Sequence, residues 1–273
     1  MIAAVPPSPP EAMPDPDLVD RYLARVGLGG AGDPSLADLH RAHVQSIPYE
    51  NLDVVLGREI RLDVPGLAAK LVDGGRGGYC YEHNTLLAAV LEALGADLTR
   101  CLGRVRLGDP TSPRPATHMV LLVDGRVVDV GFGAATPLGP VPLGGEATYG
   151  PWTWRTSRTS TPEGEDAWQM ALSDLVLYTF TDEPRHPVDY VTPNHYSSTH
   201  PRSVFTGVPI VQRWEGDVQV GLVGLELTER RPDGADVTTV EPAAVGDLLR
   251  HRFGLALDDG EVARVVATVP PPG

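Results

Sequence analysis

Three side chains in the sequence have the chemistry of a nucleophile, a base and a group that orients the base. Cys80 follows the glycine-rich stretch RGGY (76–79) and stands at the start of an apolar repeat typical of a buried helix. Unpaired N–H groups and partial positive charge at a helix N-terminus stabilise a thiolate. His118 and Asp129 lie on either side of an Asp-Gly pair at 124–125, which predicts a tight β-hairpin turn.

The predicted hairpin brings the histidine and the aspartate together. If residues 124–125 form a two-residue loop, Val123 pairs with Arg126 and Val120 pairs with Asp129. Side chains alternate between the faces of a strand, so His118 and Asp129 share a face, with Cα atoms roughly 7–8 Å apart. A carboxylate in an apolar strand is costly without a partner. The pattern therefore predicts a hydrogen bond between the two side chains.

A Cys–His–Asp arrangement is the chemistry that these residues favour. His118 would take the thiol proton of Cys80, and Asp129 would fix the imidazole tautomer. Thiol proteases and transglutaminase-like amide hydrolases share such a triad, and peptide cleavage without a thioester would mark them. A non-catalytic binding protein with Cys80 merely buried also fits, since free cysteines often pack as small apolar residues. Slow alkylation of Cys80 would support that alternative.

Composition limits the classes of partner. The 273 residues include 22 basic and 36 acidic side chains, giving a formal net charge of −14. We therefore expect no nucleic-acid partner and no docking on an anionic membrane. Two cysteines, Cys80 and Cys101, exclude a disulfide framework, and the absence of a secretory signal or transmembrane run predicts a cytoplasmic location. His40 and His43 have no evident third ligand, so no metal is expected. The oligomeric state stays open.

Hydrophobic periodicity predicts helices first and strands afterwards, behind a proline-rich lead-in at 1–16. The expected helices are 17–26, 35–47, 64–72, 80–94 and 242–253. The expected strands are 98–107, 117–123, 126–131, 152–156, 168–172, 175–181, 208–214, 222–230 and 237–240. Residues 189–205 read as irregular or briefly helical. This order predicts an α+β fold rather than alternating βαβ units.

The chain resembles the arylamine N-acetyltransferases in four motifs that follow the family's order. The motifs are IPYENLD (47–53), RGGYCYEHN (76–84), VDVGFG (128–133) and NHYSSTHPRSVF (194–205). The resemblance implies an N-terminal helical bundle (1–97), a central β-barrel (98–193) and a C-terminal α/β lid (194–273). It also implies a papain-like site of Cys80, His118 and Asp129.

The same resemblance implies an activity. Cys80 would attack acetyl-CoA in a ping-pong reaction that gives an acetyl-cysteine and free CoA. An arylamine, arylhydrazine or N-hydroxyarylamine would then take the acetyl group. Related amide synthases instead close a macrolactam from a carrier-bound polyketide thioester, and this alternative stays open at the level of sequence.

Further site residues are implied by position in the family's motifs. The expected acceptor pocket consists of Tyr49, Val105, Phe132 and Phe205. The residues expected near the thiol arm of the acyl donor are Thr117, Phe132 and Gly133. Glu50 and Arg76 resemble a structural ion pair that supports the site. Tyr49 stands where the family more often has phenylalanine, which would put a hydroxyl group at the pocket.

Overall fold

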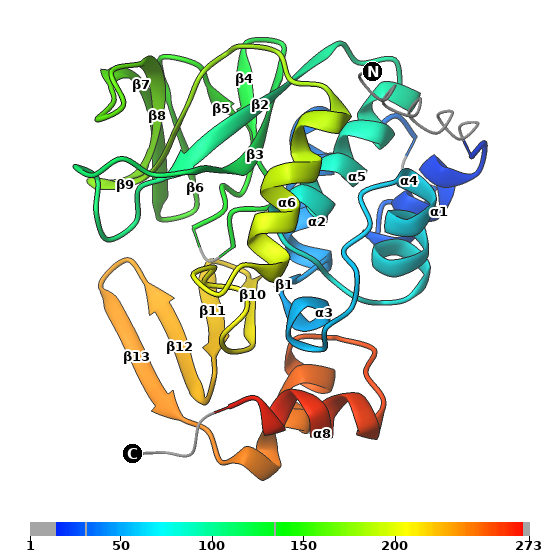
Figure 1. Cartoon of the computed structure of the whole chain (residues 1–273). Helices are drawn as coiled ribbons and strands as arrows, with labels where there is room; N and C mark the ends of the chain where they lie inside the picture. Colours follow the sequence, from blue (N-terminus) through cyan, green and yellow to red (C-terminus); the bar gives the residue numbers. More distant parts are fainter. Residues whose placement is uncertain (1–14, 31, 134, 270–273) are drawn as a thin grey trace, which may run out of the picture.

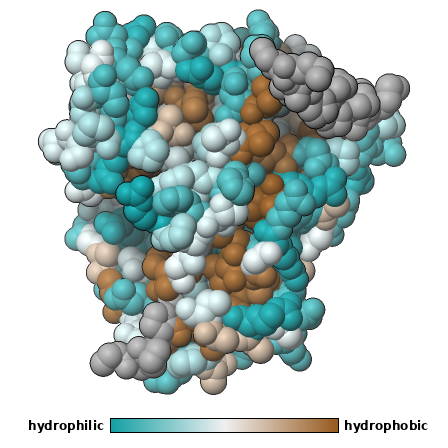
Figure 2. Space-filling view, in the orientation of Figure 1, coloured by the Kyte–Doolittle hydropathy of each residue, from teal (hydrophilic) through white to brown (hydrophobic). Residues whose placement is uncertain are grey.

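The computed structural model describes residues 15–30, 32–133 and 135–269, so most of the predicted proline-rich lead-in lies outside the described residues. Helices from the first third of the chain lie beside an eight-stranded antiparallel sheet, and a five-stranded sheet with the C-terminal helices lies below them (Figure 1). The predicted α+β class is confirmed. Figure 2 shows that hydrophilic side chains cover most of this face of the molecule.

The N-terminal helices begin where the sequence predicts. They are α1 (Leu18–Arg25), α2 (Leu36–Ser46), α3 (Leu52–Val55), α4 (Val64–Leu67) with a π-helical continuation (Ala68–Asp73), and α5 (Cys80–Ala93). Ser35 and Asp38 form a reciprocal capping box at the start of α2. Asp63 caps α4 by accepting from the Gly66 N–H at 3.0 Å. Helix α3 was not predicted, because four residues are too few to show a helical period.

Eight antiparallel strands form a sheet that curls into a nearly closed barrel. The strands are β2 (Leu98–Val105), β3 (Ala116–Val123), β4 (Arg126–Val128), β5 (Val141–Pro142), β6 (Glu146–Tyr149), β7 (Trp152–Ser160), β8 (Asp166–Leu172) and β9 (Leu175–Phe180). Their order is β5-β4-β3-β2-β9-β8-β7-β6. The two edge strands, β5 and β6, also lie in contact, which brings the ends of the sheet together.

The hairpin between β3 and β4 has the predicted register. Val123 pairs with Arg126 across a turn in which Asp124 and Gly125 have φ angles of 48° and 69°. Two positive φ angles are the signature of the type I′ turn that Asp-Gly favours. Strand β4 ends at Val128, so the predicted strand 126–131 is too long and Asp129 lies just beyond the ladder.

A second sheet pairs one short strand from the first third of the chain with four strands from the last third. Its strands are β1 (Tyr49–Glu50), β10 (Ile210–Glu215), β11 (Val218–Val223), β12 (Glu226–Arg231) and β13 (Gly234–Thr239), in the order β1-β10-β11-β12-β13. In β1, Tyr49 pairs with Gln212 of β10. The predicted single strand 222–230 is wrong, because a turn at Gly224, with φ of 59°, separates β11 from β12.

The C-terminal part also contains helices. Helix α6 (Val191–Thr199) follows a 3-10 turn (Pro187–Tyr190), and the predicted helix 242–253 appears as a 3-10 turn (Pro242–Ala244), α7 (Val245–Asp247) and a π-helical turn (Leu248–Arg252). Helix α8 (Asp259–Ala267) was not predicted, although Asp258 caps it by accepting from the Glu261 N–H at 2.7 Å. Within the described ranges, no helix has the length and apolar character needed to cross a membrane.

Candidate active site

Cys80 is the first residue of α5 and is almost completely buried, with 3% of its surface exposed. Its Sγ lies 3.8 Å from the carbonyl oxygen of Thr117 in β3. The preceding backbone is fixed by Glu82, whose carboxylate accepts from the Tyr79 N–H at 3.0 Å. A Cβ at Gly78 would lie 2.6 Å from the same carboxylate, which explains the need for glycine there. The thiol is thus held at a helix N-terminus against the barrel.

His118 and Asp129 make the hydrogen bond that the hairpin predicts. The His118 Nε2 lies 2.8 Å from the Asp129 Oδ2, and the two residues are 2% and 0% exposed. The other carboxylate oxygen of Asp129 accepts from the Gly131 N–H at 3.0 Å. The carboxylate is therefore satisfied without water, and the orientation of the imidazole is fixed.

The electrostatics of this pair favour a charged imidazole. Burial lowers the pKa of His118, but the charge and hydrogen bond of Asp129, together with the sulfur of Cys80, raise it to about 10. Burial raises the pKa of Asp129, and the charge and hydrogen bond of His118 then bring it below its ordinary value. The arrangement can hold a proton on the imidazole beside the sulfur, which is the state that activates a cysteine nucleophile.

Asn84 is a supporting residue that the sequence reasoning missed. Its Nδ2 donates to the Met119 carbonyl at 2.8 Å and to the Asp129 Oδ1 at 3.0 Å, and its Oδ1 accepts from the Val130 N–H at 3.0 Å. Asn84 follows Cys80 by four residues and so lies on the same face of α5. That spacing was the available signal. One buried amide thereby connects the helix of the thiol to the loop of the carboxylate.

Close backbone contact also fixes the distance between α5 and the loop after β4. A Cβ added at Gly131 would lie 2.7 Å from the Cys80 Cα, closer than real side chains approach. Only glycine lets the loop rest directly against the first turn of the helix. Steric contact therefore explains why the first glycine of the motif VDVGFG, Gly131, has no side chain.

The residues of the two predicted pocket sets differ in how directly they contact the histidine and Tyr49. Phe132 packs edge-on against His118 with ring centroids 5.1 Å apart, and Phe205 lies 6.4 Å from Tyr49. A Cβ at Gly133, where φ is 85°, would lie 2.1 Å from the Gln212 Oε1 and 3.5 Å from the Tyr49 ring. Val105 pairs across the strands with Tyr178, whose ring centroid lies 4.6 Å from that of His118. The half-buried members of the two predicted sets are Tyr49, Val105, Thr117, Phe132 and Phe205.

The predicted ion pair between Glu50 and Arg76 is present, and it belongs to a larger buried cluster. Arg76 Nη2 lies 2.8 Å from Glu50 Oε1 and 3.2 Å from Asp53 Oδ1. Lys70 Nζ lies 2.8 Å from Asp53 Oδ2 and 2.7 Å from Glu82 Oε1. Burial raises the pKa of Glu82 to about 7 against the opposing effect of Lys70. The cluster reaches the residue that caps the Cys80 helix.

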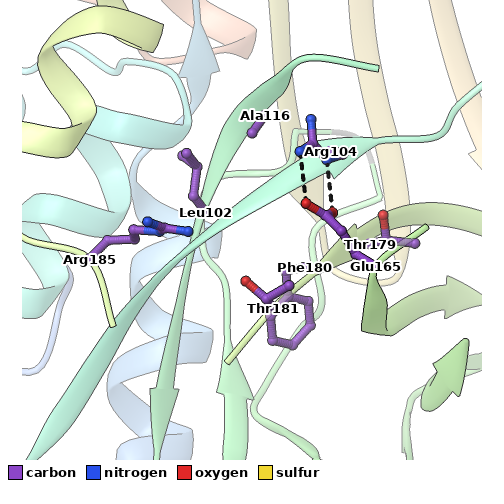
Figure 3. A pocket seen from close by; sticks show the side chains of 8 residues that line it. All are labelled: Leu102, Arg104, Ala116, Glu165, Thr179, Phe180, Thr181 and Arg185. Carbon is purple, nitrogen blue, oxygen red and sulfur yellow. Dashed lines mark hydrogen bonds and ion pairs between the residues drawn. The ribbon is translucent and has the colours of Figure 1, made fainter. Parts of the chain in front are cut away.

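A separate pocket lies along β2 and β9, where Arg104 and Glu165 form a paired contact (Figure 3). None of Cys80, His118 and Asp129 lines it. His40 and His43, the conceivable metal pair, instead point to different partners: the carbonyl of Pro137, and Tyr22 with His83. Across the residues that the structure describes, no group of three or more metal-ligating side chains was found.

Comparison with known proteins gives the class to which this site and fold belong. A family model described as N-acetyltransferase matches residues 34–262. The arylamine N-acetyltransferase of Mycolicibacterium smegmatis is 43% identical over 256 residues, covering 87% of this chain and 92% of the relative. The chain therefore belongs to the arylamine N-acetyltransferase family and is an acyltransferase.

Solved structures agree with this assignment. The arylamine N-acetyltransferase of Mycobacterium abscessus superposes with a TM-score of 0.85 at 36% identity, covering 92% of this chain and 94% of that chain. The Mycobacterium marinum enzyme in complex with CoA gives a TM-score of 0.83 at 34% identity, covering 92% and 99%. These relatives are named as acetyltransferases, which does not favour the macrolactam alternative.

Proposed function

We propose that this protein transfers an acetyl group from acetyl-CoA to an arylamine, arylhydrazine or N-hydroxyarylamine through an acetyl-cysteine at Cys80. One observation carries the proposal: a thiol at a helix N-terminus lies beside a buried imidazole that a carboxylate holds at 2.8 Å. A thioester donor and an aromatic amine acceptor agree with the names of the relatives and with the CoA complex of the Mycobacterium marinum enzyme.

The first half of the reaction forms the acyl-enzyme. The Cys80 sulfur attacks the thioester carbonyl carbon while its proton resides on His118. The tetrahedral intermediate collapses with cleavage of the bond to the CoA sulfur, and the imidazolium returns the proton to the leaving thiolate. Asp129 stays ionised and keeps the imidazole in one orientation.

The second half transfers the acetyl group. A neutral aromatic amine attacks the acetyl-cysteine carbonyl, His118 accepts the amine proton, and the Cys80 thiolate leaves. Aromatic amines are weak bases, so they are uncharged and nucleophilic near pH 7. Tyr49, Val105, Phe132 and Phe205 are proposed to hold the ring, and Thr117, Phe132 and Gly133 to adjoin the thiol arm of CoA.

Release of CoA tests the proposal. We expect acetyl-CoA to release CoA in an amine-dependent manner with the wild-type protein and not with Cys80→Ala. A wild-type protein whose Cys80 alkylates rapidly but which releases no CoA with any aromatic amine or hydrazine would contradict the proposed donor.

A further inference from the structure

Two buried histidines on neighbouring helices have no part in the proposed transfer of the acetyl group. His43 of α2 and His83 of α5 are 0% and 1% exposed. The His43 Nε2 lies 2.8 Å from the His83 Nδ1, and the Tyr22 hydroxyl lies 2.9 Å from the His43 Nδ1. A chain of hydrogen bonds therefore runs from α1 through α2 to the first turn of the helix that begins at Cys80.

Both imidazoles are neutral at pH 7. Desolvation by burial lowers the pKa of His83 to about 4. Burial also lowers the pKa of His43 well below its ordinary value, and the positive charge of Arg25 acts in the same direction. Each neutral imidazole has one N–H, so at the contact between the rings one nitrogen donates its proton and the other accepts. The hydrogen bonds along Tyr22, His43 and His83 can therefore donate in only one of two directions.

The surroundings of the last ring select the direction. The His83 Nε2 is buried and has no hydrogen-bond partner among the described residues, and the carbonyls of Pro48 and Gly78 are the backbone acceptors that face this ring. An N–H at this position is attracted to both carbonyl oxygens, whereas a lone pair would be repelled. Each histidine thus carries its proton on Nε2, and the Tyr22 hydroxyl donates to His43.

The hydrogen-bond chain ends at His83, where the motifs IPYENLD and RGGYCYEHN contact each other. The Gly78 carbonyl accepts from the Glu50 N–H at 2.7 Å, and a Cβ at Gly77 would lie 1.9 Å from the Pro48 oxygen. Segments 48–50 and 77–79 therefore touch along their backbones. The Tyr49 ring lies nearly parallel to the His83 ring, at 18° and with centroids 6.2 Å apart. His83 therefore lies beside Tyr49, near the backbone contact between the two segments.

We propose that Tyr22, His43 and His83 form a one-directional hydrogen-bond chain in which His83 positions Tyr49 for the amine acceptor. The acceptor rests on the proposed function, while the chain itself rests on the contacts described above. His83 touches no reacting atom in this scheme and acts through Tyr49, so it is a positioning residue.

Two substitutions of His83 separate this role from a general loss of stability. In His83→Asn the amide oxygen can replace Nδ1 as the acceptor for His43, but the N–H toward Pro48 and Gly78 is lost. In His83→Gln the side-chain amide can supply that N–H, but the acceptor for His43 is lost. Each variant loses one end of the chain, so similar falls in melting temperature are expected.

The two variants should differ with the amine. We expect kcat/KM for an arylamine to fall about fivefold to tenfold in His83→Asn and less than about twofold in His83→Gln, because only His83→Asn loses the N–H that faces the Pro48 and Gly78 carbonyls. The rate of Cys80 alkylation should stay within about twofold of wild type in both variants, because Tyr49 and not the thiol is displaced. Equal losses in the two variants, no loss in His83→Asn, or a parallel loss of alkylation would overturn the proposal.

Imidazole nitrogen spectra test the chain without any substrate. Long-range ¹H–¹⁵N correlation at pH 7 should show both His43 and His83 as Nε2–H tautomers, and Tyr22→Phe should give a mixture at His43. An Nδ1–H tautomer or a charged ring at either position in the wild-type protein would refute the direction of the chain. A wild-type protein that transfers no acetyl group, yet shows these spectra, would contradict the proposed function alone.

Discussion

Replacing Asp129 with asparagine is the most informative change to the site. The substitution removes one buried negative charge and keeps the shape of the side chain. Without that charge, burial dominates and the pKa of His118 falls below its ordinary value of 6.5 instead of lying at about 10. The difference between 6.5 and 10 corresponds to roughly 5 kcal/mol in favour of the charged ring. His118 is therefore charged at pH 7 in the wild-type protein and neutral in the variant.

The expected consequence is a slower reaction of the thiol. An ordinary thiol is only a few per cent thiolate at pH 7, so loss of the imidazolium should slow iodoacetamide alkylation of Cys80 about 10-fold to 100-fold. Because His118 keeps its proton up to about pH 10, the wild-type rate should exceed the variant rate throughout the range from about pH 6 to pH 9. Asp236→Asn, which removes an exposed carboxylate whose side chain is 82% accessible, is the matched control.

The reasoning has a clear point of failure. If Asp129→Asn alkylates at pH 7 as fast as wild type and the Asp236→Asn control, then Asp129 does not maintain a charged imidazole beside the thiol. A variant that has unfolded would show a lost thermal transition, which separates this outcome from misfolding.

Three further predictions follow from individual contacts. The Asn51 side chain makes three hydrogen bonds of 2.7–2.9 Å to the backbone of residues 205–210. Asn51→Asp should raise the KM for an arylamine about tenfold, because a carboxylate repels the two carbonyl oxygens to which the amide donates. An unchanged KM would contradict this prediction. Burial lowers the pKa of His40 to about 4, so between about pH 4 and pH 6.5 the imidazole binds a proton in the unfolded chain but not in the folded protein. The melting temperature should therefore fall as the pH is lowered through that range, and it should fall less steeply in His40→Gln. Gly131→Ala should destabilise the fold by about 1–3 kcal/mol in urea titrations, since its Cβ would lie 2.7 Å from the Cys80 Cα; wild-type stability and activity would refute the steric argument.

The local features of the site could be predicted from the sequence. The Asp-Gly pair at 124–125 set the hairpin register, and the register placed His118 and Asp129 on one face. The glycine-rich stretch and the apolar period after it set the start of α5. These features depend on residues close together in the chain, where turn chemistry and periodicity act directly. Their catalytic roles remain a prediction until the assays are done.

Long-range pairing could not be predicted in the same way. The pairing of β1 with β10 joins Tyr49 to Gln212, and nothing local marks a two-residue strand. Helix α8 was not predicted, because its apolar residues, confined to 262–267, span too short a segment to show a helical period. The buried chain from Tyr22 to His83 needs three helices to meet, which a one-dimensional pattern does not encode. The division into segments at 97/98 and 193/194 stays a prediction, and the second sheet contains strands from both the first and the third of these segments.

The most direct test of the central claim is the mass of the protein after brief exposure to acetyl-CoA. We predict that wild-type protein gains one acetyl group, that peptide mapping places it on Cys80, and that adding an arylamine removes it with formation of an equal amount of acetylated amine. Cys80→Ala should gain none. Amine acetylation without any acetyl group on Cys80, or an acetyl group on Cys80 that no amine removes, would contradict transfer through this cysteine.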